Sequence, residues 1–189
     1  MSNDHEDRYV LRGALVALAP LDKADAPLYT RWINDPAVKA GFLDNGLYTV
    51  ADEERFIDML QAQSAQVDPS GSRFAIHELG SGAPIGLTGL FDISWRHRRA
   101  ELAISMGPAQ MRGRGLGTEA VTLTLRWAFE VLSLNSVGLA AIDLGRGTRC
   151  WENSGFRHVG RRRQAVLAGG ALRDELLMDV LAQDVATPA

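Results

Sequence analysis

Three alternating glycines and two arginines stand together in the segment Met111-Arg112-Gly113-Arg114-Gly115-Leu116-Gly117-Thr118. Glycines at this spacing let the backbone bend tightly and approach a ligand without a Cβ in the way. The apolar pattern that follows predicts a helix over 118–132, so the loop lies at a helix N-terminus, with unpaired N–H groups and a partial positive charge. Together with two guanidinium groups, this loop predicts a binding site for a phosphate or pyrophosphate.

Two other phosphate-binding classes fit the segment less well. No Gly-Lys-Ser/Thr follows the loop, which argues against a nucleoside triphosphatase. Residues 115–120 match the dinucleotide pattern G-x-G-x-x-A, and Asp143 ends the next strand-like run, as a ribose-binding acid would. However, the preceding strand-like run, 101–106, ends well before the glycines, and too little chain remains after Asp143 for a six-stranded sheet. A dinucleotide-binding oxidoreductase is therefore a poor second reading.

The loop must be positioned by one domain of mixed elements. We expect strands near 10–18, 73–79, 84–91, 100–106, 136–142, 156–167 and 174–181, and helices near 22–33, 118–132 and 146–153. Thr49 is a candidate N-cap for a further helix, with Asp52 at its third position. We expect a single domain over 10–181, an N-terminal tail over 1–9 and a C-terminal tail over 182–189.

Composition narrows the function classes. The chain has 189 residues, 46% of them hydrophobic, and a net charge of −3, which does not favour general nucleic-acid binding. No run of apolar residues is long enough for a membrane span, and no secretory signal is apparent at Met1–Arg8, so we expect a cytoplasmic protein. The single cysteine, Cys150, fits a reducing compartment and is expected to pack rather than react. No metal site is expected, and the sequence leaves open whether the chain forms a homodimer.

The order of these motifs resembles the GNAT superfamily of N-acetyltransferases. Within that superfamily, the chain is most similar to ribosomal-protein N-terminal alanine acetyltransferases and spermidine acetyltransferases. The loop fits the superfamily's Arg/Gln-x-x-Gly-x-Gly/Ala signature as residues 112–117. Four stretches carry the closer likeness: Trp32-Ile33-Asn34-Asp35-Pro36, Arg98-Arg99-Ala100-Glu101-Leu102, Gly115-Leu116-Gly117-Thr118-Glu119-Ala120 and Trp151-Glu152-Asn153-Ser154-Gly155-Phe156.

The resemblance implies an α+β fold in which a mixed, mainly antiparallel sheet splays open at the acetyl-CoA site, with helices on both faces. Pantetheine would lie along one strand like an extra strand, and the pyrophosphate would take N–H groups of the glycine loop. The implied cofactor-binding residues are Ile104, Ser105, Met106, Arg112, Gly113, Arg114, Gly115, Leu116, Gly117 and Thr118.

The implied chemistry is acyl transfer from a thioester to an amine, which must lose a proton before it attacks. Glu101, at the start of the cofactor strand, is the first candidate for the base or for an anchor of the amine. Asp92 and His97 are weaker candidates, and Trp95 is a candidate for the substrate mouth. The run 161–163 is either a solvated strand face or a contact for the 3′-phosphate of CoA.

The chain departs from the superfamily where a general acid is expected. Members usually carry Asn, Arg and Ala, and then a Tyr four residues before Gly-Phe; here Leu144, Arg146, Gly147 and Trp151 hold those places. Trp151 cannot protonate a leaving thiolate, because its indole N–H does not ionise usefully. We expect an acetyl-CoA-dependent N-acetyltransferase acting on a primary amine, of a protein N-terminus or a small molecule. The alternative is a non-catalytic acyl-CoA sensor that has lost the acid.

Overall fold

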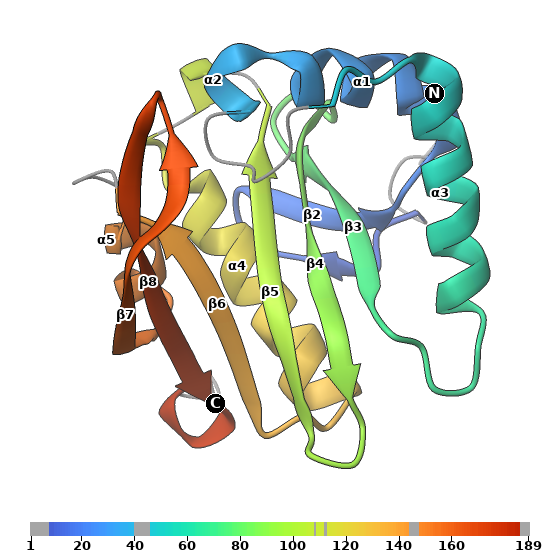
Figure 1. The fold of residues 1–189 in the computed structure, drawn as a ribbon. Helices are drawn as coiled ribbons and strands as arrows, with labels where there is room; N and C mark the ends of the chain where they lie inside the picture. The colour runs from blue at the N-terminus through green and yellow to red at the C-terminus, as the bar shows by residue number, and fades with distance from the viewer. Residues whose placement is uncertain (1–7, 40–45, 108, 112, 144–147, 186–189) are drawn as a thin grey trace.

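An eight-stranded sheet in the order β1-β2-β3-β4-β5-β6-β8-β7 forms the centre of the molecule (Figure 1). The structure, a computed structural model, describes residues 8–39, 46–107, 109–111, 113–143 and 148–185. The strands are β1 (Leu11–Arg12), β2 (Val16–Pro20), β3 (Ser72–Glu78), β4 (Pro84–Ser94), β5 (Arg99–Met106), β6 (Ser136–Ile142), β7 (Arg157–Ala168) and β8 (Ala171–Leu181). Every neighbouring pair is antiparallel except β5 and β6, which are parallel. This mixed, mainly antiparallel sheet confirms the expected fold and contradicts a parallel dinucleotide-binding sheet.

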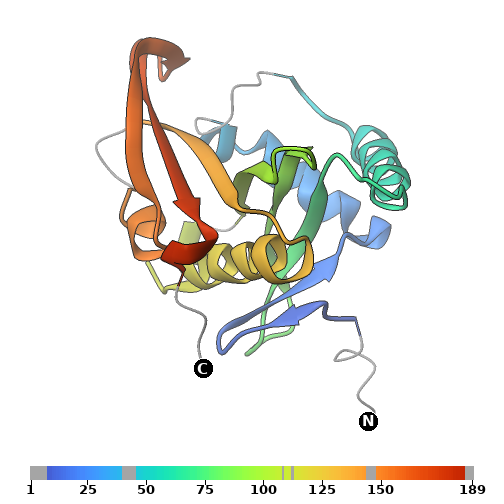
Figure 2. The ribbon, with the colours of Figure 1, turned by 90° about the horizontal axis from the view of Figure 1, so that it is seen from below.

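Helices lie on both faces of the sheet (Figure 2). One face carries α4 (Leu116–Arg126), which continues as a π-helical turn η3 (Trp127–Val131), and α5 (Thr148–Asn153). The other face carries α1 (Ala26–Asn34), α2 (Pro36–Lys39) and α3 (Val50–Ser64), and short 3₁₀ turns lie at η1 (Lys23–Asp25), η2 (Ala109–Met111) and η4 (Ala182–Asp184). None of the helices in the described ranges has both the length and the apolar character that a bilayer crossing requires.

The core divides by strand alternation, because successive side chains of a strand point to opposite faces. On β5, Ala100 and Leu102 pack with α4 in the main cluster around Val121 and Leu125. Glu101, between them, therefore points to the opposite face, where α1 and α3 pack over β3 in a separate cluster.

The start of α3 agrees with the expected capping residues, whereas the start of α4 differs from the expected position. Thr49 and Asp52 form the complete capping box of α3. The helix after the glycine loop begins at Leu116, two residues before the expected Thr118, because Gly115 at φ 79° is its left-handed N-cap. The final segment, expected as a tail from 182, begins as the turn η4, in which Asp184 pairs with Arg157 at 2.9 Å.

The expected first strand, 10–18, is two strands joined by a turn. The Glu119 carboxylate on α4 accepts hydrogen bonds from the backbone N–H groups of Ala14, Leu15 and Val16 at 2.9, 2.7 and 2.7 Å. A Cβ on Gly13 would lie 2.6 Å from Glu119 Cδ, so the turn is built around this carboxylate. One side chain in the first turn of α4 thus fixes the β1–β2 hairpin beside the glycine loop.

Replacing Glu119 by alanine is expected to lower the free energy of unfolding by about 2 kcal/mol, because three N–H groups lose a charged acceptor. The measurement is urea denaturation followed by circular dichroism. Glu130→Ala is the matched control on the same helical segment: its exposed ion pair with Arg126, at 3.5 Å, is expected to contribute less than about 0.5 kcal/mol. Equal losses for the two variants would show that Glu119 is only a surface carboxylate.

Candidate active site

The sheet opens between β5 and β6, directly beside the glycine loop. The two strands pair only at Arg99↔Ser136, Ala100↔Val137 and Glu101↔Gly138, whereas β5 continues to Met106. Figure 1 shows the two strands close together at one end and apart at the other, with α4 behind the gap. The backbone of Ile104, Ser105 and Met106 therefore faces the opening without a partner strand on that side among the described residues. An amide-bearing arm can pair with such an edge as an added strand does.

The glycine loop has the geometry of an anion cradle. Gly113 and Gly115 have φ of 74° and 79°, conformations that residues with a Cβ rarely adopt. A Cβ on Gly113 would meet no described atom within 4 Å, and one on Gly115 would meet only Leu15, at 3.7 Å, so space is open above both residues. The N–H groups that begin α4 have no acceptor one turn earlier in the helix. These observations fit the pyrophosphate of acetyl-CoA.

Arg114 does not extend freely into solvent. Its guanidinium pairs with Glu78 at 2.7 Å and also donates to Met111 Sδ at 3.0 Å. The hydroxyl of Ser81 and the guanidinium of Arg114 both lower the pKa of Glu78. A phosphate at the loop would therefore either bind Arg114 together with Glu78 or take the place of Glu78 as the partner of Arg114. Arg112, the first residue of the signature, lies outside the described residues.

An aromatic ring packs against the chain at the C-terminal end of β5. A Cβ on Gly107 would lie 2.2 Å from the Trp32 ring of α1. Trp32 in turn contacts Tyr29, with ring centroids 5.7 Å apart. Trp32, from one of the stretches that carry the family resemblance, thus packs α1 against the chain directly after β5.

Glu101 lies at the point where β5 and β6 separate. Its partner in the register is Gly138, and a Cβ there would lie 2.9 Å from each carboxylate oxygen, so this glycine leaves room for the carboxylate. Burial raises the pKa of Glu101; Arg99 and Arg162 lower it, and Asp92 raises it further. A carboxylate with a raised pKa is a stronger base than an exposed one. No pattern in the sequence identifies Gly138 as part of this site, because its contact with Glu101 depends on the parallel register of β5 and β6.

The weaker candidates for the base, and the other histidines of the described residues, have different surroundings. Asp92 is exposed in a bulge of β4, with φ of 51°, and His97 is exposed in the β4–β5 turn. The indole N–H of Trp95 donates to the carbonyl of Pro69 at 3.1 Å, so Trp95 ties this turn to the chain before β3. His77 is buried and bonds Arg8, while His158 lies near Glu152 at 3.4 Å.

The basic run of β7 lies in ion pairs on the β7–β8 hairpin. Arg161 pairs with Asp143 and Asp174, each at 3.2 Å, and Arg162 pairs with Glu175 at 2.6 Å. This arrangement supports the interpretation of a strand face rather than a contact for the 3′-phosphate of CoA.

Cys150 and Trp151 lie on α5, beside the start of α4. The Thr118 hydroxyl donates to Cys150 Sγ at 3.5 Å, and burial is the main reason that the pKa of the Cys150 thiol is raised. The Trp151 ring packs edge-on against Phe156, with centroids 6.0 Å apart, next to the main core. Leu144, Arg146 and Gly147, the other departures from the family pattern, lie outside the described residues.

Exchanging Trp151 for Phe or Tyr is expected to leave kcat within about threefold of the parent, because neither change removes a group that transfers a proton. Both changes are expected to lower the melting temperature, since a smaller ring leaves space beside Phe156. Steady-state turnover at several pH values and thermal melts measure the two effects. A Trp151→Tyr enzyme at least about tenfold faster, with a new alkaline limb, would show instead that this position faces the leaving sulfur.

The described parts of the chain contain no group of His, Cys, Asp or Glu that could hold a metal ion. The geometry thus comprises a glycine loop at the start of a helix, an open strand edge and a partly buried carboxylate where the edge begins. All three belong to one opening in the sheet.

Comparisons with known proteins agree with this geometry. A family model described as "Acetyltransferase (GNAT) domain" matches residues 16–147. The spermidine N(1)-acetyltransferase of Escherichia coli (strain K12) is 26% identical over 165 residues, covering 86% of this chain and 84% of that protein. The corresponding enzyme of Vibrio cholerae serotype O1 is 24% identical over 129 residues, covering 68% and 74%.

Solved structures share the fold. Spermidine N-acetyltransferase from Vibrio cholerae, in complex with CoA and spermine, superposes with a TM-score of 0.81 at 19% identity, covering 91% of this chain and 98% of that one. Mycobacterium smegmatis RimJ, in complex with CoA-disulfide, superposes with a TM-score of 0.80 at 19% identity, covering 91% and 84%.

Proposed function

Because this chain belongs to the GNAT acetyltransferase family and is an acetyl-CoA-dependent N-acetyltransferase, we propose that its acceptor is the primary amine of a small molecule. In this proposal the amine binds against Glu101 on the face of the sheet that carries α1 and α3, which we call the acceptor face. The observation that carries the proposal is the position of Glu101 at the start of the β5–β6 opening, with its side chain on the face opposite α4. The curated relatives from Escherichia coli and Vibrio cholerae are spermidine acetyltransferases, which supports a small amine as the acceptor class.

The cofactor residues divide between two roles. Acetyl-CoA, when bound, supplies the acetyl group as a thioester. The N–H groups of Gly113, Gly115 and the first turn of α4 hold its phosphates, and the free edge of Ile104–Met106 orients its amide arm. A backbone N–H of this edge also stabilises negative charge on the acetyl oxygen as the amine attacks.

Glu101 performs the proton transfer in this scheme. An alkyl ammonium carries one proton too many for attack, and the Glu101 carboxylate accepts it. A C–N bond then replaces the C–S bond, and the CoA thiolate leaves. After attack the nitrogen carries a positive charge again and loses a second proton as the amide forms. Because Trp151 does not act as an acid, the thiolate takes this second proton or one from solvent, and slow turnover of generic amines follows.

Two experiments test the proposed function. Calorimetric titration with acetyl-CoA, CoA and NADH is expected to show binding of the first two only. Turnover of acetyl-CoA, followed by thiol release, is then measured with spermidine, hexan-1-amine and a short peptide with a free N-terminus. Turnover with the peptide alone would contradict a small-molecule acceptor, and acetyl-CoA binding without turnover of any amine would support the sensor alternative.

A further inference from the structure

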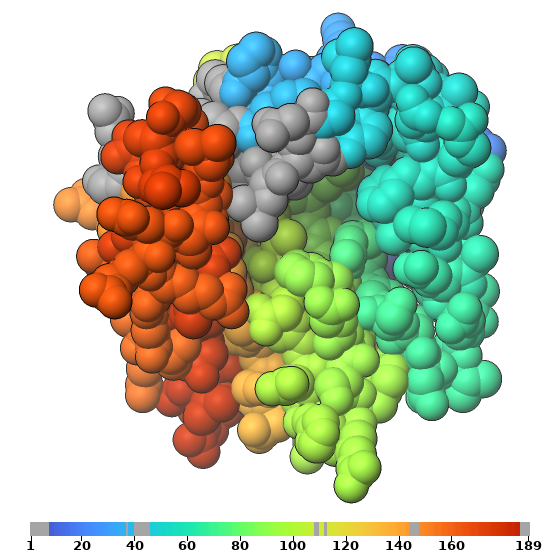
Figure 3. Space-filling model, in the orientation of Figure 1, coloured from blue at the N-terminus to red at the C-terminus, as the bar shows by residue number. Residues whose placement is uncertain are grey.

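A hollow of about 210 Å³ lies on the acceptor face, next to the strand pair that carries Glu101. It is formed by the C-terminal turns of α3, the start of β3 and the bulged end of β4. Figure 3 shows this face from the outside, with α3 at one side and the β7–β8 hairpin at the other. The polar groups that line the hollow come from Gln63, Ser64, Ser70, Arg73 and Asp92.

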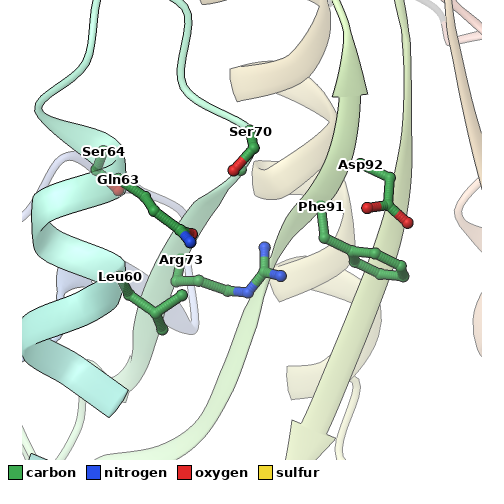
Figure 4. A pocket seen from close by; sticks show the side chains of 8 residues that line it. Leu60, Gln63, Ser64, Ser70, Arg73, Phe91 and Asp92 are labelled. Carbon is green, nitrogen blue, oxygen red and sulfur yellow. The ribbon is translucent and has the colours of Figure 1, made fainter. Parts of the chain in front are cut away.

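Among the described residues, Arg73 is the only side-chain cation that lines this hollow. Its guanidinium lies 5.4 Å from the centroid of the Phe91 ring, and Figure 4 shows it directed between this ring and Asp92. Its one hydrogen bond within the described residues is a long one, 3.4 Å, to the carbonyl of Ser72. A guanidinium has five N–H donors in a planar fork that matches a carboxylate, so most of this donor capacity is not used by the described residues.

Burial has an electrostatic consequence for Arg73. Loss of solvent lowers the pKa of its guanidinium, and Asp92 opposes the shift from a distance. Arginine stays protonated in proteins even so. The hollow therefore contains one permanent positive charge with reduced hydration, at Arg73, and one carboxylate, at Asp92. A ligand carboxylate would bind at the Arg73 guanidinium.

The register relates Arg73 to Glu101. Phe91 pairs directly with Glu101 across β4 and β5, and Arg73 packs its guanidinium on Phe91 from the strand beyond. Asp92 both lines the hollow and acts on the pKa of Glu101. From the spacing of paired side chains, Arg73 and Glu101 present their charged groups on the order of 10 Å apart.

We propose that this hollow is a second acceptor subsite, in which Arg73 binds a carboxylate of the acceptor while the acceptor's amine lies at Glu101. The inference rests on the proposed function and narrows it: the preferred acceptor is an amine with a carboxylate about 10 Å away, not a polycation. A diamine of the same length would place its second ammonium against the Arg73 guanidinium, which like charges disfavour.

The experiment compares two acceptors of equal length, 6-aminohexanoate and hexan-1-amine, at saturating acetyl-CoA. The readout is the ratio of their kcat/KM values, with hexane-1,6-diamine as a third probe. In the parent enzyme, kcat/KM for 6-aminohexanoate is expected to exceed that for hexan-1-amine at least about tenfold, which is the effect of one charge-assisted contact. Arg73→Met, which keeps the stem over Phe91, is expected to reduce that ratio to about one, and Arg73→Lys is expected to restore part of it.

Arg99→Met is the matched control, because Arg99 lies on the same face but does not line the hollow. It is expected to leave the ratio as it is in the parent. Thermal melts confirm that each variant is folded, and calorimetric binding of 6-aminohexanoate to the CoA-bound protein gives a second measure that does not need turnover. Binding is expected to weaken at least about tenfold in Arg73→Met, as the lost contact predicts.

Two results separate failure of this subsite from failure of the proposed function. A ratio near one in the parent, or one that Arg73→Met does not change, overturns the subsite while acetyl transfer itself stands. If no amine is acetylated, the proposed function fails. The binding measurement still tests the subsite in that case, because equal binding of 6-aminohexanoate to the parent and to Arg73→Met overturns it.

Discussion

Replacing Glu101 by glutamine is expected to lower kcat by about 10²–10⁴-fold, the usual contribution of a general base. Glutamine keeps the size of the side chain beside Gly138 but cannot accept a proton. Acetyl-CoA affinity is expected to stay within about threefold of the parent, because the loop and the strand edge are unchanged. Steady-state kinetics with 6-aminohexanoate or spermidine measure both quantities, and Glu130→Gln, remote from the opening, is the control.

The raised pKa of Glu101 sets the direction of the pH dependence. The base is the ionised form, so kcat/KM falls as the pH drops through the pKa of Glu101, and burial moves this acid limb above the position of an ordinary glutamate. For stability the sign is opposite. A carboxyl with a raised pKa in the folded state contributes stability below its unfolded pKa and loses it as the pH rises through the folded value.

Glu101→Gln is therefore expected to be at least as stable as the parent at pH 7, and to lose the acid limb. Loss of turnover together with a lower melting temperature would indicate that Glu101 holds the strands together rather than acts as a base.

A valine at Gly115 is expected to weaken acetyl-CoA binding by more than about tenfold, or about 1.4 kcal/mol. Gly115 caps α4 at φ 79°, a conformation that a β-branched residue avoids, so the substitution turns the loop N–H groups away from the phosphates. The added methyl groups also enter the space above the loop, where a Cβ would meet only Leu15. Calorimetric titration with acetyl-CoA gives the affinity.

Gly169→Val separates the ligand effect from backbone strain. Gly169 lies in the β7–β8 turn, also in the left-handed region, with φ of 60°, and a Cβ there would meet no described atom within 4 Å. It carries the same kind of strain far from the loop, so the acetyl-CoA affinity of this variant is expected to match the parent. Equal weakening in both variants would mean that the loss reflects general destabilisation.

The sequence predicts those parts of the fold that depend on local chemistry. The capping box at Thr49 and Asp52, the hairpin of β3 and β4 and the glycine loop before α4 each have their determinants within a few residues, and all are confirmed. The break between β1 and β2 could not be predicted, because its determinant, Glu119, lies about a hundred residues away in the chain. The end of α3 at Ser64 could not be predicted either, because no local stop signal in the sequence marks it.

The candidate site shows the same division. The cofactor residues 104–106 and 112–118 are predicted from motif and resemblance, and they stay a prediction, which the Gly115 experiment tests at the glycine loop. The register brings Glu101 to Gly138, and Arg73 to Phe91, from strands separated by long connections. No pattern in the sequence encodes a register between distant strands, so the hollow beside Glu101 could not be foreseen.

The opening between β5 and β6 also bears on edge-to-edge aggregation, in which unpaired strands of different molecules pair with each other. A strand with unpaired backbone groups is a template for another chain, and an open edge at the rim of a sheet invites aggregation. Here the free edge of β5 lies inside the sheet, between flanking strands, and not at its rim. The outer edges are protected differently. One is the two-residue strand β1, and the other is β7, which has irregular register and carries Arg157, Arg161, Arg162 and Arg163. The sheet thus has one unpaired strand edge in its interior, while shortness and charge protect its two outer edges against pairing with another strand.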